Sequence, residues 1–226
     1  MTRMPEALAR LQTLLAEPGG GARVVRGRAA QGEGRAAAVL ILFSAPHHDA
    51  PPTDLELVLI EKSATLRKHA GQCAFPGGGV EAQDASSEET ALREAREEVG
   101  IDAATVELLG VLPQAQVAAT GYDVTPVVGW WREPHPLEIV DRVEVGAIHL
   151  LRVGELIDPA NRLTWRLPMG YRGPAFVVRD LFIWGFTGHL IDGLLGLACW
   201  EQPWDDRRVS LVPERFLHRA GRDTGQ

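Results

Sequence analysis

The chain has 226 residues, 45% of them hydrophobic, which is enough to bury the core of one domain or of two small ones. Its 23 basic and 30 acidic residues give a formal net charge of −7, which argues against a nucleic-acid groove or an anionic membrane as the main partner. We expect a single domain over residues 1–226, with an N-terminal helix and a short C-terminal extension.

The cysteine content and the N-terminal sequence indicate the cellular compartment of the protein. Cys73 and Cys199 are far apart and lack zinc-type spacing, so we expect reduced thiols. The N-terminal sequence MTRMPEALARLQTLLAEPGGG lacks the charged, apolar and small-residue regions of a signal peptide. No apolar run reaches the length that spans a membrane. These features predict a cytoplasmic protein.

The first predicted element is a helix at 5–16, which places leucines on one face and ends at EPGGG. We expect it to pack on the domain as a lid or clasp, and the sequence leaves open whether it mediates a homodimer. The apolar runs 37–44 and 55–62 are short and are separated by a turn-rich segment, so they are predicted to be paired strands.

A helix is predicted next at 86–99, because Ser86 and Glu89 have capping-box spacing and Gly100 can end it. Further strands are predicted at 106–112, 122–131, 146–153, 161–167 and 175–184. Another helix is predicted at 184–198, and the arginine-rich tail after Trp204 is expected to be peripheral. This order predicts an α+β fold in which helices flank a mixed sheet.

The helix predicted at 86–99 carries three acidic side chains on one face. Glu94 is three residues before Glu97 and four before Glu98, which places each of these two within roughly 60° of Glu94 around the axis. Like charges at this spacing repel each other unless a cation or an arginine lies among them. Clustered oxygen ligands suit Mg²⁺ or Mn²⁺, which bridge to substrate phosphates. The other interpretation is a solvated helix face.

Two neighbouring features favour the metal interpretation. Arg93 is four residues after Glu89 and four before Glu97, a spacing that lets it orient a carboxylate. The run of three glycines that ends at Gly79 lets the backbone pass close to a ligand or offer a carbonyl to a metal. The alternative for the glycines is a tight turn between a strand and the helix.

Residues 78–101 resemble the Nudix box, whose second half reads Arg-Glu-apolar-any-Glu-Glu-any-Gly-apolar. The sequence REAREEVGI fits that half without exception. In the first half, the acidic slot falls on Ala85 when counted back from Arg93 and on Asp84 when counted from Gly78. The longer spacing with aspartate resembles the branch of Nudix hydrolases that cleave coenzyme A.

A second segment, VLIEKSATLRKHAGQCAFPGG at 58–78, resembles a motif that the same branch carries upstream of the box. The matching positions are Leu59, Ser63, Arg67, Gly71, Phe75, Pro76, Gly77 and Gly78. Val58 and Ile60 depart from the motif, and Lys62 replaces an arginine. Lysine keeps the charge but loses the bidentate geometry of the guanidinium group.

The resemblance implies a Nudix-like α/β/α sandwich with a mixed β-sheet. It also implies a hydrolase that uses Mg²⁺ or Mn²⁺ to cleave the pyrophosphate of coenzyme A, or of a derivative, to 3',5'-ADP and 4'-phosphopantetheine. One alternative is a Nudix pyrophosphatase for ADP-ribose, NADH or an oxidised nucleotide. The other is a non-catalytic nucleotide-binding sensor, against which the three mutually repelling carboxylates argue.

The resemblance further implies roles for particular residues. The metal ligands would be Gly78, Glu94, Glu97 and Glu98. The catalytic group would comprise Glu97, Glu98, Arg93 as an orienting residue, and Glu144 as a candidate general base. The substrate contacts would be Lys62, Arg67, Lys68 and Phe75. For Glu144 and for the basic residues, the competing interpretation is an exposed position on a loop.

Overall fold

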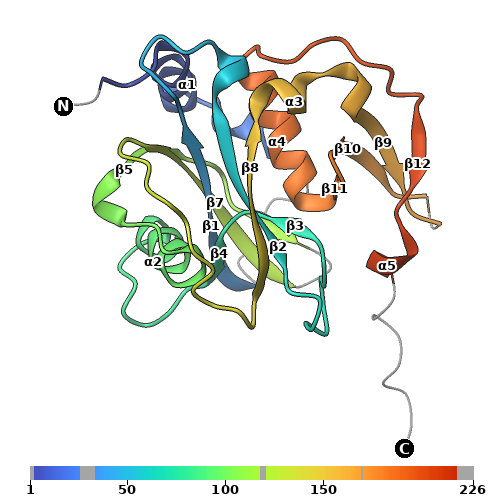
Figure 1. Ribbon diagram of the computed structural model, residues 1–226, viewed down its shortest axis with the longest axis horizontal. Coiled ribbons are helices and arrows are strands. Elements are labelled where there is room, and N and C mark those ends of the chain that lie inside the picture. Colours follow the sequence, from blue (N-terminus) through green and yellow to red (C-terminus); the bar gives the residue numbers. More distant parts are fainter. Residues whose placement is uncertain (1–2, 26–33, 118–120, 169, 218–226) are drawn as a thin grey trace, which may run out of the picture.

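The computed structural model describes residues 3–25, 34–117, 121–168 and 170–217. In these residues, helices lie on both sides of an eight-stranded sheet, and a four-stranded sheet adjoins it (Figure 1). None of the described helices is both long and apolar enough to cross a membrane. The architecture confirms the predicted α+β fold and adds a second sheet that was not predicted, while the single-domain organisation stays a prediction.

The large sheet is built around β1 (Arg35–Ser44), which pairs in parallel with β7 (Tyr122–Trp131) and antiparallel with β2 (Glu56–Lys62). Its order is β3-β2-β1-β7-β5, with β4 beside β1, β6 beside β7 and β8 beside β2. Its other strands are β3 (Cys73–Ala74), β4 (Gly77–Gly79), β5 (Val106–Val111), β6 (Ala115–Val117) and β8 (Val145–Arg152). One parallel pair among antiparallel pairs makes the sheet mixed, as predicted.

Alternate residues of the large sheet pack against different helices, because neighbouring side chains of a strand point to opposite faces. Leu40 belongs to the hydrophobic cluster that includes α2 (Ser87–Val99). Ile41, the next residue, belongs to the cluster that includes α1 (Glu6–Ala16) and α4 (Gly185–Leu197). The sheet therefore lies between two helical layers, which is the predicted α/β/α arrangement.

The ends of α2 follow from local sequence. The Ser86 hydroxyl accepts a hydrogen bond from the Glu89 backbone N–H at 3.3 Å, and the Glu89 carboxylate accepts one from the Ala85 N–H at 2.8 Å. Gly100 adopts a left-handed conformation with φ of 75°, which glycine adopts without steric cost. The predicted Ser86 N-cap and the end at Gly100 are therefore confirmed, whereas the Glu89 carboxylate bonds to the residue before the N-cap and does not complete the predicted capping box.

The N-terminal helix packs on the chain's own core. Leu8 and Leu11 are completely buried, and the helix lies against β5. At this contact a side chain at Gly110 would come within 3.2 Å of Leu15. The expected packing on the domain is thus confirmed, and a homodimer through this helix stays a prediction.

The second sheet has the order β11-β10-β9-β12 and lies on the side of α4 away from the large sheet (Figure 1). Its strands are β9 (Arg162–Arg166), β10 (Arg172–Val178), β11 (Leu181–Ile183) and β12 (Val209–Leu211). The short helices α3 (Val153–Ile157) and α5 (Glu214–Leu217) complete the described helices. One hydrophobic cluster contains residues of both sheets and of α4, so a shared core connects them.

Two sequence predictions in this region were wrong. The strand predicted at 175–184 is a hairpin, because Arg179 takes a left-handed φ of 55° and reverses the chain between β10 and β11. The tail after Trp204 is not only peripheral, since β12 pairs in parallel with β9. Two of the five arginines of that tail, Arg219 and Arg222, lie outside the described residues.

Arg162 connects the second sheet to α4 through a buried charge. Its side chain is fully buried and forms an ion pair with Asp192 of α4. The guanidinium carbon lies 4.5 Å from the centre of the Trp204 ring, a cation–π contact. Burial lowers the pKa of Arg162, while Asp192 opposes that shift. The charge is therefore held by its partners and not by water.

We expect Asp192→Ala to lower the free energy of unfolding by about 3 kcal/mol, because the Arg162 cation would remain buried without its main partner. Urea unfolding followed by tryptophan fluorescence measures the change. Asp206→Ala, which removes an exposed carboxylate from the same region, is the matched control and should change stability by less than about 0.5 kcal/mol. Equal effects of the two substitutions would contradict a structural role for the Arg162–Asp192 pair.

Candidate active site

The glycine strand β4 brings the backbone close to both β1 and α2. A Cβ atom at Gly77 would lie 2.3 Å from the Ala38 carbonyl oxygen and 2.6 Å from the Val39 Cα. Neither atom can move away, because both belong to the central strand of the sheet. The Gly77 N–H donates a hydrogen bond of 2.9 Å to Glu98 of α2. Only glycine permits this close approach.

Gly78 leaves room for the carboxylate of Glu94. A Cβ atom at Gly78 would lie 2.5 Å from Glu94 Oε1 and 2.7 Å from Oε2. The missing side chain therefore allows the carboxylate to lie against the β4 backbone. This places the predicted metal ligands Gly78 and Glu94 side by side, from segments that are separated by a loop.

Arg93 connects the acidic helix to the glycine strand through hydrogen bonds. Its guanidinium group donates two hydrogen bonds of 3.0 Å to Asp84 and one of 3.0 Å each to Glu94 and Glu97. It also donates one of 2.9 Å to the Gly79 carbonyl. The predicted orienting role agrees with these contacts, but Asp84, and not Glu89, is the second main partner. The signal was present in the sequence, since Asp84 fills the acidic slot of the box.

Lys62 joins the upstream motif to the acidic helix. Its Nζ donates hydrogen bonds to Glu98 Oε1 at 2.9 Å and to Glu144 Oε2 at 3.2 Å. The side chain of Glu98 is only 4% exposed, whereas that of Glu144 is 51% exposed. The Ser63 N–H also donates to the Glu144 carbonyl at 2.7 Å, which fixes the loop before β8 beside Lys62. Glu144 is therefore part of this cluster, as its candidate role requires.

The cluster shifts the pKa values of its members. Burial raises the pKa of Glu98, and Lys62 opposes that shift. Burial by itself would lower the pKa of Lys62, but the attraction of Glu98 and Glu144 prevails and raises it, so the ammonium stays charged. Burial also raises the pKa of Glu94, with the charges of Glu98 and Glu97 adding to the shift. The hydrogen bond from Arg93 holds the pKa of Asp84 well below its usual range.

The structure places the predicted substrate contacts in two different environments. Arg67 and Lys68 are exposed on the loop that follows Lys62, and no ion pair within the described part of the chain holds either of them. Phe75 is 3% exposed and packs in the core on the α4 side of the sheet. Its ring offers no surface to a substrate in this structure, so the placement corrects its predicted role to core packing.

The donor set fits a hard divalent cation. Carboxylates from one helix face and a backbone carbonyl are ligands of the type that Mg²⁺ and Mn²⁺ take, and the space at Gly78 admits Glu94. Within the described ranges, no group of three acidic, histidine or cysteine side chains already surrounds one point. Lys62 and Arg93 are hydrogen-bonded to these carboxylates instead. A single ion shared by Glu94, Glu97 and Glu98 stays a prediction.

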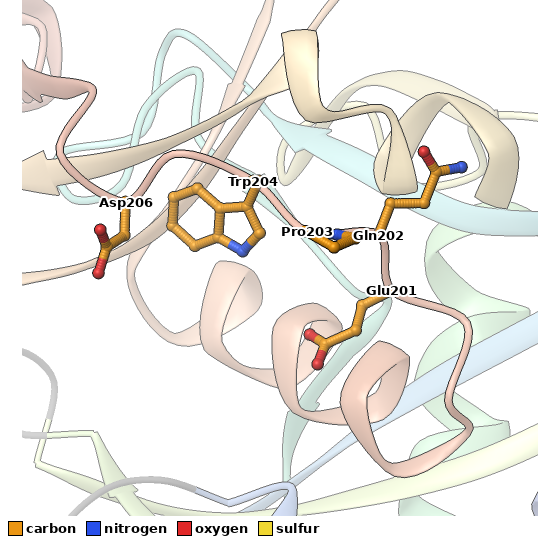
Figure 2. Close-up of a pocket in the computed structure, with 5 residues that line it drawn as sticks. All are labelled: Glu201, Gln202, Pro203, Trp204 and Asp206. Atoms are coloured by element: carbon orange, nitrogen blue, oxygen red, sulfur yellow. The ribbon is translucent and has the colours of Figure 1, made fainter.

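A cavity of about 410 Å³ lies elsewhere, on the segment that connects α4 to β12. Its lining comes from one segment and includes Glu201, Gln202, Pro203, Trp204 and Asp206 (Figure 2). These residues include none of the predicted site residues. The cavity is open and its lining is mainly polar and acidic, so it does not complete the candidate active site.

The comparisons with known proteins identify the family. A model of the NUDIX domain matches residues 34–168, which is more than half of the chain and includes the glycine strand, the acidic helix and Glu144. The chain belongs to the Nudix hydrolase family. The match covers both motifs on which the resemblance was based.

Two relatives show how far the similarity extends. A protein of Escherichia coli K12 is 59% identical over 140 residues, covering 60% of this chain and 71% of the relative. One from Cronobacter sakazakii is 41% identical over 154 residues, covering 65% and 77%. Both are named "Uncharacterized Nudix hydrolase NudL".

Solved structures are more distant. A Caenorhabditis elegans Ap4A hydrolase in a binary complex is 14% identical, with a TM-score of 0.48, and the match covers 74% of this chain and 98% of the other. The Nudix hydrolase RenU of M. smegmatis is 21% identical, with a TM-score of 0.44 over 55% of this chain and 74% of the other. Because both TM-scores are below 0.5, the family assignment rests on the sequence matches.

We expect Gly77→Ala to destabilise the protein by about 2 kcal/mol or more, because the new methyl group would overlap with the β1 backbone. Gly79→Ala is the matched control, since a Cβ atom there meets nothing within 4 Å. Thermal and urea unfolding of both variants measures the difference. If Gly77→Ala were as stable as Gly79→Ala, the close packing of β4 on β1 would be incorrect.

Proposed function

We propose that the chain hydrolyses the pyrophosphate bond of coenzyme A, or of a derivative, in a reaction that depends on Mg²⁺ or Mn²⁺. The products would be 3',5'-ADP and 4'-phosphopantetheine. The observation that carries the proposal is the hydrogen bond between Lys62 and Glu98. It joins the motif that resembles coenzyme A hydrolases to the Nudix box, so both motifs contribute to one site.

The acidic helix and the glycine strand would hold the metal. Glu94, Glu97, Glu98 and the Gly78 carbonyl are the proposed ligands. A divalent cation would lower the pKa of a bound water and offset the charge of the pyrophosphate oxygens. Arg93 would keep Glu94 and Glu97 in place, as its hydrogen bonds to both indicate. Asp84, paired with the same guanidinium group, would fix the orientation of Arg93 in turn.

Two carboxylates are candidates for the general base. The side chain of Glu144 is 51% exposed and that of Glu97 is 50% exposed, so water can reach either. Glu144 lies on a loop next to Lys62, outside the acidic helix, and could therefore accept a proton without giving up a position on the metal. We favour Glu144 as the general base, and the glutamates of the acidic helix remain the alternative.

The loop after Lys62 would bind the phosphates of the substrate. Arg67 and Lys68 are exposed on it, within six residues of Lys62 along the chain. Coenzyme A differs from simpler dinucleotides by its 3'-phosphate, and two adjacent basic side chains offer a place for this additional charge. The same loop would be of less use to a substrate that lacks a further phosphate.

Incubation of the purified protein with coenzyme A and Mn²⁺ should yield 3',5'-ADP and 4'-phosphopantetheine, identified by mass spectrometry. EDTA should abolish the reaction, and added Mg²⁺ or Mn²⁺ should restore it, because the proposed hydrolysis depends on a divalent ion bound by the carboxylates. Dephospho-coenzyme A, ADP-ribose and NADH, tested in parallel, report substrate preference. Faster turnover of ADP-ribose or NADH would identify another Nudix substrate, and no turnover of any nucleotide would favour a binding-only module.

We expect Glu98→Gln to lower kcat/KM by about a hundredfold or more, because the side chain loses the charge that binds metal. Glutamine has one acceptor oxygen, so it keeps the hydrogen bond from either Lys62 or the Gly77 N–H and loses the other. The apolar residues that pack α2 on the sheet are unchanged, so circular dichroism should still show an intact fold, with a modest loss of thermal stability. Glu88→Gln makes the same chemical change in the first turn of α2 and should leave turnover nearly unchanged. An unaltered rate for Glu98→Gln would remove Glu98 from the metal site.

A further inference from the structure

The ammonium group of Lys62 lies beside Glu98, one of the carboxylates that the proposed metal would need, and beside Glu144. It is 2.9 Å from Glu98 Oε1 and 3.2 Å from Glu144 Oε2. The other carboxylate oxygen of Glu98 accepts the Gly77 N–H at 2.9 Å. Both oxygens of Glu98 are therefore engaged by the protein, and only the Lys62 contact involves a side chain that could move away.

The fold directs Lys62 to this position. In β2, Val58 and Ile60 belong to the cluster on the α2 side of the sheet, and Lys62 is the next residue in that alternation. The pairing of β2 with β8 shifts register between Glu61 and Lys62, where the regular ladder ends. A β-bulge of this kind re-aims a side chain next to a site. The side chain is 16% exposed and so remains open to solvent on one side.

We propose that Lys62 is an intrinsic cation that competes with the divalent metal for Glu98. Metal binding displaces the Lys62 ammonium from Glu98, and the freed group then faces the phosphates of the substrate. The inference rests on the proposed metal site. In this proposal Lys62 has two successive roles. Before metal binds, it is the counter-ion of Glu98, and after metal has bound, it contacts the phosphates of the substrate.

The electrostatics of the cluster favour such an exchange. Without a cation, Glu98 would be a nearly buried charge with one backbone hydrogen bond, which is unfavourable. One ammonium group compensates part of the charge of Glu98, Glu144 and Glu94, and a divalent ion compensates more of it. Lysine suits a displaceable role, because its ammonium is a point charge on a flexible stem. The arginine of the related motif would bind a carboxylate in a bidentate and less exchangeable way.

Calorimetric titration with Mn²⁺ tests the competition directly, without substrate. We expect Lys62→Met to bind Mn²⁺ about tenfold more tightly than the wild type, because the ion no longer displaces a charged hydrogen bond. Lys62→Arg should bind no more tightly than the wild type. Lys68→Met, at the chain's other lysine, removes the same charge from an exposed position and should change the affinity by less than about twofold. Equal or weaker Mn²⁺ binding by Lys62→Met would overturn the proposal.

A second measurement uses the unaltered protein, and so does not depend on whether the variants fold. The chain has two lysines, so ¹³C,¹⁵N-labelled lysine gives one set of side-chain resonances for Lys62 and one for Lys68. We expect Mg²⁺ to shift the Lys62 Cε and Nζ resonances in a saturable manner, with the same midpoint as in calorimetry, and to leave Lys68 unchanged. Saturable Mg²⁺ binding with unmoved Lys62 resonances would overturn the inference.

The outcomes separate this inference from the proposed function. If Mg²⁺ moves Lys62 but coenzyme A is not hydrolysed, the proposed substrate fails and the exchange at Lys62 stands. If coenzyme A is hydrolysed with metal but Lys62 does not move, the exchange fails and the substrate stands. If neither the wild type nor Lys62→Met binds Mg²⁺ or Mn²⁺, both are wrong.

Discussion

The repulsion among three carboxylates within little more than one turn of α2 is the constraint on which the site depends. Glu94, Glu97 and Glu98 would repel one another at a cost of a few tenths of a kcal/mol per pair on an isolated helix, and more where water is excluded. Two cationic side chains of different kinds compensate these negative charges in the structure. Arg93, fixed by Asp84, bridges Glu94 and Glu97, while Lys62 neutralises the buried Glu98. The helix stays in place because its apolar residues pack on the sheet.

The two cations differ in how firmly they are held. Arg93 makes hydrogen bonds to three carboxylates and to the Gly79 carbonyl, so removing it from any one of them leaves the others intact. Lys62 bonds to two carboxylates, one of which is half exposed on a loop. This difference between Arg93 and Lys62 suits a site that must admit an ion and yet remain folded without it. One cation maintains the geometry while the other can leave.

Local signals allowed much of the fold and part of the site to be predicted. The caps of α2 involve residues within a few positions of one another, and β1 and β2 are short apolar runs separated by a turn-rich segment. The contact of Lys62 with Glu144 spans 82 residues and depends on the register of β2 against β8, which no local pattern encodes. The resemblance to a family placed Glu144 near the site, whereas propensities alone would have shown only an exposed loop residue with no assigned partner.

The two wrong predictions for the second sheet have different physical causes, one local and one long-range. The sequence 175–184 reads as one apolar strand only if the charged pair Arg179–Asp180 is passed over, and that pair marks the turn at which the chain reverses. The pairing of β12 with β9 joins segments more than 40 residues apart, and the exposed side chains of Val209 and Leu211 do not predict it. This long-range pairing decides the place of β12, and no local pattern of residues 209–211 encodes it.

The Phe-Pro-Gly-Gly sequence shows why matching a motif does not by itself identify contact residues. Phe75 is buried in the core on one side of the sheet, and the Pro76 carbonyl accepts the Leu40 N–H at 2.8 Å. Gly77 and Gly78 then bring the backbone against Glu98 and Glu94 on the other side. The motif thus ties the core to the acidic helix within four residues. The buried Phe75 anchors the glycine strand on one face of the sheet. This anchor fixes the backbone that contacts the carboxylates of Glu94 and Glu98 on the other face.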